Sequence, residues 1–148
     1  MKEAIGTSMV FNLMMVFIGV MIIILVGSIS YSKGFKVRNR IIDRIQEYNG
    51  YNADVDSDVK AAIEGDLQSI GYKIVKDLNC KDRGPTANLL TTDYNTYNYC
   101  VYEYSTSRGK YYGVTVFISF DVPLIGDYIN IPIYGETRIV YDKGEVIG

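Results

Sequence analysis

One stretch near the N-terminus constrains most of what this chain can fold into. From Ala4 to Ser32 there is no charged side chain, and Met9 to Ile29 is almost unbroken Met, Val, Ile, Leu and Phe. The hydrocarbon core of a bilayer is ~30 Å thick and a helix rises ~1.5 Å per residue, so ~20 apolar residues cross it. The sequence therefore predicts a transmembrane helix over residues 4–32 and single-pass attachment to the cell membrane.

A cleaved secretory signal is the alternative for this segment. The apolar part of such a signal is ~7–15 residues long and ends at a small-residue cleavage site. Here the apolar run is longer, and Gly27-Ser28-Ile29-Ser30 matches such a site poorly. We therefore expect a retained anchor.

The helix is expected to continue beyond the membrane as an amphipathic extension over residues 33–50. Its apolar residues recur at steps of three and four, which is the period of one helix face: Val37, Ile41, Ile45 and Tyr48. Asn49-Gly50 is a helix stop. These features predict one helix, or two nearly collinear helices, from about Glu3 to Tyr48.

Residues 51–148 are expected to form a globular head. A short second helix is indicated by an apolar stripe and by Gly71 after it; the stripe is Val59, Ile63, Leu67 and Ile70. Asp56 or Ser57 is placed to cap its start, and Asp58 lies in its first turn, where a carboxylate interacts favourably with the helix dipole.

Strand patterns follow this helix. Alternating or β-branched and tyrosine-rich runs predict strands at 73–78, 97–105, 112–122, 128–133 and 137–141, with a loop over 80–92 and a break near Tyr134-Gly135. Helices first and then strands at hairpin spacing are typical of an α+β fold. The expected head is therefore an antiparallel β-meander packed on helix.

The amino-acid composition argues against several classes of function. A net charge of −2 offers no electrostatic basis for nucleic-acid binding. Histidine is absent, which excludes Ser/His/Asp and Cys/His catalysis, and two cysteines cannot by themselves form a structural zinc site. Asp54, Asp56 and Asp58 are spaced like the start of a calcium loop, but Val59 and Gly65 stand where that loop needs Gly and Glu. We expect no enzymatic activity, no metal, no cofactor and no small-molecule substrate.

Two signals disagree about which side of the membrane the head occupies. Lys33, Lys36, Arg38 and Arg40 follow the apolar run, and the positive-inside rule then places the head in the cytoplasm. Cys80 and Cys100, the only two cysteines, fit a disulfide formed in an oxidising compartment. Two unpaired structural thiols are the alternative for this pair.

Three further groups are candidates for contacts between subunits. Tyrosine is enriched at interfaces, and the strand-forming region contains Tyr99, Tyr102 and Tyr104; the alternative is that tyrosine simply favours half-buried strand positions. Gly19 and Gly27 are small residues that permit close helix approach in a membrane. Glu3 either lies among the lipid headgroups or pairs with the N-terminal amine of a neighbouring subunit.

Taken together, these segments resemble type IV pilins and pseudopilins. The resemblance rests on Glu3, on the run Met9–Ile29, on Lys36–Tyr48 (KVRNRIIDRIQEY), and on the hairpin-like end Val114–Val140. More narrowly, the chain is similar to the small TadE/TadF-like pseudopilins of Tad (Flp-type) pilus systems of Gram-positive bacteria. Cleavage after Gly6, as in a prepilin, would remove Glu3, so we expect a chain that is already processed or is never cleaved.

The resemblance implies a function. It implies a minor pilin or pseudopilin, a structural subunit of a Tad-type pilus or related secretion apparatus, with its head outside the cell. Its partners would be the lipid bilayer, other pilin-like subunits and the assembly machinery. The alternative function is a single-pass, membrane-anchored extracellular module for ligand binding or sensing.

Overall fold

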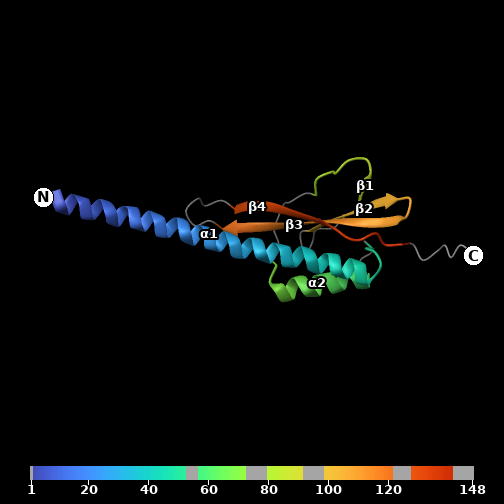
Figure 1. Cartoon of the computed structure of the whole chain (residues 1–148). Coiled ribbons are helices and arrows are strands. Elements are labelled where there is room, and N and C mark those ends of the chain that lie inside the picture. Colours follow the sequence, from blue (N-terminus) through green and yellow to red (C-terminus); the bar gives the residue numbers. More distant parts are fainter. Residues whose placement is uncertain (1, 53–56, 73–79, 92–98, 122–127, 142–148) are drawn as a thin grey trace, which may run out of the picture.

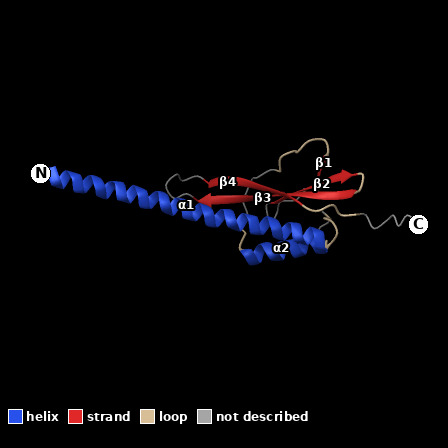
Figure 2. Ribbon diagram, in the orientation of Figure 1, coloured by secondary structure: helices blue, strands red, loops and turns tan. Residues whose placement is uncertain are grey.

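The fold is organised around one long helix that leaves the head at one end and forms part of its core at the other (Figure 1). The computed structural model describes residues 2–52, 57–72, 80–91, 99–121 and 128–141. This part of the chain contains two helices and a four-stranded antiparallel sheet, which Figure 2 shows in distinct layers. The predicted α+β fold is confirmed.

Helix α1 spans Lys2–Glu47, a length of 46 residues, or ~70 Å at the usual rise. It passes through Gly34 without interruption, so the apolar segment and the amphipathic extension are one helix rather than two. Asn49 adopts a φ of 53°, and Gly50 N–H donates to the Ile45 carbonyl at 2.9 Å, which closes the helix end. Tyr48, which was predicted to lie on the apolar stripe, lies in this turn instead and is 44% exposed.

The head covers one face of the second half of α1. Val37, Ile41 and Ile45 are at most 1% exposed, as the periodicity predicted. Gly34 sets how closely the helix approaches the sheet, because a Cβ at this position would meet Ile118 and lie 2.8 Å from Ile133 Cδ1. A glycine here therefore lets two core isoleucines pack directly on the helix backbone.

Helix α2, Asp58–Ile70, runs back alongside α1 (Figure 1). Its buried side chains are Val59, Ile63 and Leu67. Gly71 ends the helix in a left-handed conformation with a φ of 71°. Ser57 occupies the N-cap position but does not cap the helix through its side chain; its hydroxyl donates to the Asn52 carbonyl at 2.9 Å.

An ion pair ties the two helices together. Arg44 Nε donates to Asp66 Oδ2 at 2.7 Å and Arg44 Nη2 donates to Asp66 Oδ1 at 3.2 Å, a two-pronged contact. These hydrogen bonds from Arg44 lower the pKa of the Asp66 carboxyl, and the charge of Arg40 lowers it further. Because the pair is partly exposed, its main effect is on the register of α2 along α1.

The sheet is a meander with strand order β1-β2-β3-β4, every pair antiparallel. The strands are β1, Ala87–Leu89; β2, Tyr99–Thr106; β3, Gly109–Asp121; and β4, Tyr128–Glu136. Three details of the strand prediction were wrong. β1 lies inside the expected loop, β4 continues through Gly135, and 137–141 forms only an isolated bridge, Lys110↔Val140. The expected strand at 73–78 lies outside the described residues.

Each strand alternates between a core face and an outer face. On the core face, Val101 of β2 and Val114, Val116 and Ile118 of β3 pack against the helices. The opposite face carries Cys100, Tyr102 and Tyr104 from β2, with Tyr111, Thr115 and Tyr134 as neighbours on β3 and β4. The head therefore has one helix-covered face of the sheet and one tyrosine-rich face.

The outer edge of β4 is partly closed. Pro132 lies in the middle of this edge strand and has no backbone N–H to offer. Arg38, reaching across from α1, donates from Nη1 to the Tyr134 carbonyl at 3.0 Å. A missing donor and an occupied acceptor make this edge a poor template for another strand.

Candidate functional site

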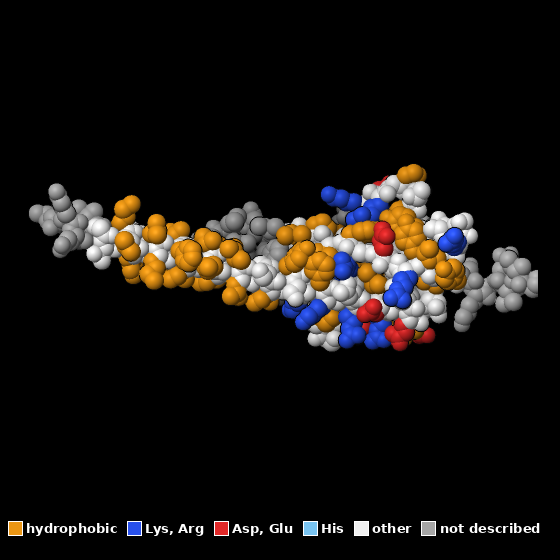
Figure 3. Space-filling view, in the orientation of Figure 1, with side chains coloured by type: hydrophobic (Ala, Val, Ile, Leu, Met, Phe, Trp, Pro, Cys, Tyr) orange, Lys and Arg blue, Asp and Glu red, His pale blue; other side chains and the backbone are white. Residues whose placement is uncertain are grey.

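The first half of α1 is the most unusual surface of the molecule. Its large apolar side chains stand free of the head, with exposed fractions from 72% at Met9 to 44% at Ile18 and Ile23 (Figure 3). Monomeric soluble proteins rarely expose contiguous apolar surface on this scale. Within the described residues this is the one helix long and apolar enough to cross a membrane. The geometry fits a membrane anchor.

Small residues interrupt this apolar surface. A Cβ added at Gly19 or Gly27 would meet nothing within 4 Å, so each leaves open space beside the helix backbone. The Ser28 hydroxyl donates to the Ile24 carbonyl at 2.9 Å, which satisfies its hydrogen bond inside an apolar medium. Glu3 lies in the first turn of α1, and its side chain is outside the described part of the chain. A contact role for Glu3, Gly19 and Gly27 stays a prediction.

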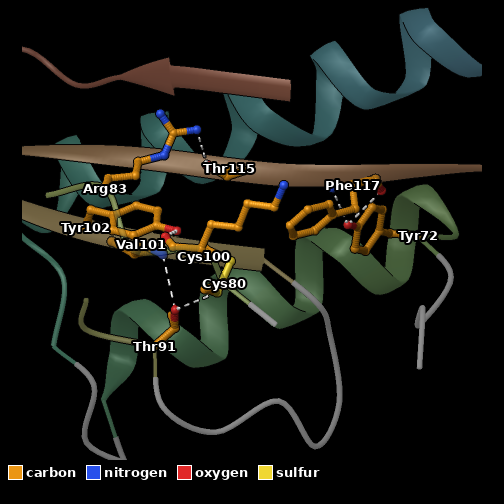
Figure 4. Close-up of a disulfide and its surroundings, with 10 residues drawn as sticks. Tyr72, Cys80, Arg83, Thr91, Cys100, Val101, Tyr102, Thr115 and Phe117 are labelled. Carbon is orange, nitrogen blue, oxygen red and sulfur yellow. Dashed lines mark hydrogen bonds between the residues drawn. A yellow bond between two sulfur atoms is a disulfide. The ribbon is translucent and has the colours of Figure 1, made fainter. Parts of the chain in front are cut away.

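A disulfide fixes the second notable region, on the outer face of the sheet (Figure 4). Cys80 and Cys100 are joined, with their Cα atoms 5.7 Å apart, so the paired alternative for the cysteines holds in this structure. Thr91 lies beside them, and its buried Oγ1 accepts from Val101 N–H at 3.2 Å. The bond anchors residues 80–91, which we call the strap, to β2.

Arg83 extends from the strap over the sheet. Its guanidinium lies 4.0 Å from the ring centre of Tyr134 and 5.6 Å from that of Tyr102, and Nη2 lies 3.5 Å from Thr115 Oγ1. Cation–π contacts of this kind hold the strap against β2 and β4, and the Thr115 contact joins it to β3. Beyond them, Tyr104 and Tyr111 stack with ring centres 4.8 Å apart. These rings therefore pack against Arg83 and against one another, while Tyr104, Tyr111 and Tyr134 each stay half-buried.

The three tyrosines proposed as contact residues occupy three different settings. Tyr99 is 4% exposed on the core face, where its hydroxyl lies 3.2 Å from that of Tyr51 and burial raises its pKa. Tyr102 is 2% exposed, and its hydroxyl donates to the Lys81 carbonyl at 2.6 Å. Tyr104 is half-buried. Of the three, Tyr104 is therefore the best placed to meet another molecule, and the contact role itself stays a prediction.

Tyr72 has a structural role for which the sequence carries no motif. Its hydroxyl donates to the Phe117 carbonyl at 3.0 Å and accepts from Phe117 N–H at 3.1 Å (Figure 4). Phe117 lies one residue beyond the last paired position of β2 and β3, Tyr99↔Val116. The Tyr72 hydroxyl therefore satisfies the N–H and the carbonyl of Phe117, which have no partner on β2 because the β2–β3 pairing ends at Val116. Burial raises the pKa of Tyr72 to about 12.

The acidic residues give no sign of a cation site within the described residues. There, no group of three or more His, Cys, Asp or Glu side chains converges. Asp58 is exposed in the first turn of α2, and Asp54 and Asp56 lie outside the described ranges. The described residues therefore do not test the Asp54, Asp56 and Asp58 spacing.

No protein-family model, no curated protein and no solved structure matches this chain. Its function is therefore inferred from its own geometry.

Proposed function

We propose that this chain is a membrane-anchored minor pilin or pseudopilin, a structural subunit of a Tad-type pilus or related secretion apparatus. The observation that carries the proposal is the continuity of α1. Its apolar half is exposed from Gly6 to Ile29, while its second half is buried in the head through Val37, Ile41 and Ile45. A single rigid helix couples the position of the anchor to the position of the head.

The proposed mechanism is physical. Before assembly, the apolar half of α1 lies in the bilayer, because contact of its apolar side chains with lipid is more favourable than contact with water. When the subunit leaves the bilayer, those side chains need new apolar partners, and the matching helices of neighbouring subunits supply them. Gly19 and Gly27 leave the backbone accessible for close approach. The head moves as one body with its helix, since the core spans α1, α2 and the sheet.

The cysteines favour placing the head outside the cell. The disulfide between Cys80 and Cys100 belongs to an oxidising compartment. A membrane-impermeant maleimide applied to intact cells should label these cysteines only after reduction. Labelling that needs cell lysis but no reductant would put the head in the cytoplasm and would contradict the pilin assignment.

Fractionation of surface filaments tests the function. The wild-type chain should appear in the sheared filament fraction of a piliated cell as well as in membranes. Ile24→Glu places a charge in the middle of the apolar segment, which costs about 3 kcal/mol or more in a bilayer. This variant should be lost from both fractions. Gln68→Glu, at an exposed position on α2, adds the same charge outside the anchor and should change neither.

Two results would contradict the proposal. One is normal recovery of Ile24→Glu in filaments, since assembly would then not depend on the apolar helix. The other is a wild-type chain that stays in membranes under shear while filaments are released. That second result would favour an anchored ligand-binding or sensory module.

A further inference from the structure

Three cations without a counter-ion follow the apolar segment directly. Lys33, Lys36 and Arg40 are exposed, and none of the three forms a salt bridge within the described residues. We call them the basic collar. Arg38 is not a member, because it is engaged with the Tyr134 carbonyl, with Asn39 and with the ring of Phe35.

The collar occupies one face of α1. Its residues follow one another at steps of three and four, so their side chains lie in one row along the helix. This row is turned roughly 100° from the buried row that includes Gly34, Val37 and Ile41. Figure 3 shows Lys and Arg side chains gathered along one side of the head, beginning where the apolar part of α1 ends. The collar therefore lies on the side of α1 beside α2 rather than on the side facing the sheet. Arg44, one turn beyond Arg40, binds Asp66 of α2, and a Cβ added at Gly71 would lie 4.0 Å from Lys33 Nζ.

Nearby acidic groups leave most of this charge uncompensated. Asp66 forms its ion pair with Arg44. Arg40 affects Asp66 through the electrostatic attraction that helps to lower the pKa of the Asp66 carboxyl. Asp43 is exposed on α1 and pairs with none of the collar residues. Between Lys33 and Arg40 the sequence contains four cations and no anion.

The collar begins at the height of the headgroup layer of a bilayer. If the run Met9–Ile29 fills the ~30 Å hydrocarbon core, Lys33 lies ~6 Å, Lys36 ~10 Å and Arg40 ~16 Å beyond it along the helix. The polar layer on each side is roughly 5–8 Å thick. Helix side chains tilt toward the N-terminus, and lysine and arginine extend their charged ends to the interface, so Arg40 also reaches back toward this layer.

We propose that the basic collar binds anionic phospholipid headgroups in the leaflet adjacent to the head. The lipid headgroups supply negative charge close to Lys33, and the side chains of Lys36 and Arg40 extend toward the same layer. A basic residue close to an anionic surface contributes ~1 kcal/mol, or about a fivefold change in association. Because the collar lies on one face of a rigid helix, it also determines which side of the head turns toward the bilayer.

Spin-labelled lipids test this directly on the full chain. The protein is reconstituted in phosphatidylcholine bilayers, and electron paramagnetic resonance measures how strongly spin-labelled phosphatidylglycerol and spin-labelled phosphatidylcholine associate with it. We expect phosphatidylglycerol to be preferred by about fivefold or more. Lys33→Gln/Lys36→Gln/Arg40→Gln should bring the ratio close to one, and ~1 M salt should do the same for the wild type.

A control triple removes the same charge elsewhere: Lys60→Gln/Arg108→Gln/Arg138→Gln. Lys60 lies in the first turns of α2, Arg108 in the β2–β3 turn and Arg138 beyond β4, all toward the end of the head away from the apolar segment (Figure 1). This control should keep the lipid preference. Equal association of both lipids with the wild type would overturn the proposal, as would an equal loss in both triples. Collar-dependent cross-linking between copies, with no lipid preference, would assign the collar to subunit contacts and overturn it too.

Discussion

Removal of the Tyr72 hydroxyl gives the sharpest test of the structure. Tyr72→Phe leaves the ring in place but removes the group that serves both Phe117 N–H and Phe117 C=O. Each hydrogen bond contributes ~1 kcal/mol net, so we expect the free energy of unfolding to fall by about 2 kcal/mol near neutral pH. The assay is denaturant unfolding of the full chain in detergent, followed by tyrosine near-ultraviolet circular dichroism.

The pH dependence of this difference is a second, independent readout. The pKa of Tyr72 is raised from 10.0 to about 12 in the folded protein, so the unfolded state loses this proton first as the pH rises. The folded state then binds more protons, and the Tyr72 contribution to stability declines from pH 10 toward pH 12. The advantage of the wild type over Tyr72→Phe should therefore shrink across that window.

Tyr141→Phe is the matched control, because Tyr141 is 68% exposed. It should change the unfolding free energy by less than about 0.5 kcal/mol. If Tyr72→Phe is as stable as the wild type near neutral pH, the hydroxyl does not stabilise β3 where its pairing with β2 ends. A stability difference that stays constant up to pH 12 would contradict the burial of the Tyr72 phenol.

Two further predictions concern the strap and the helix–sheet contact. Cys80→Ala/Cys100→Ala removes a link between residues 20 apart in sequence and should lower the unfolding free energy by about 3 kcal/mol; reductant should destabilise the wild type but not this variant. Gly34→Leu should destabilise the head by about 1–3 kcal/mol, because the new side chain overlaps Ile118. Gly65→Leu, with open space around it on α2, should instead stabilise by up to about 1 kcal/mol, and a loss of stability there would contradict this reasoning.

Periodic elements were predictable because their signal is local. Val37, Ile41 and Ile45 repeat at helical spacing, and one face of a helix must be buried. Val114 and Val116 alternate with polar residues and lie on the core face as expected.

Other features depend on residues far apart in sequence and were not predictable. β1 is three residues long and forms because β2 and the disulfide hold it in place. Arg83 lies near a Gly-Pro turn and has no motif; its position over Tyr134 follows from the strap. The segment after β4 has strand-like composition but makes a single bridge, because Thr137 uses its N–H and hydroxyl to bond the backbone of Tyr112.

Under the proposed function, in which α1 anchors the head in a membrane, the closed edge of β4 has a further consequence. Confinement in two dimensions raises the local concentration of neighbouring heads. At such crowding an open strand edge would recruit the next head into an irreversible sheet. Pro132 and the Arg38 contact to Tyr134 keep this edge from pairing. In that proposed setting, heads lie side by side without pairing through β4, and contacts between copies depend on α1.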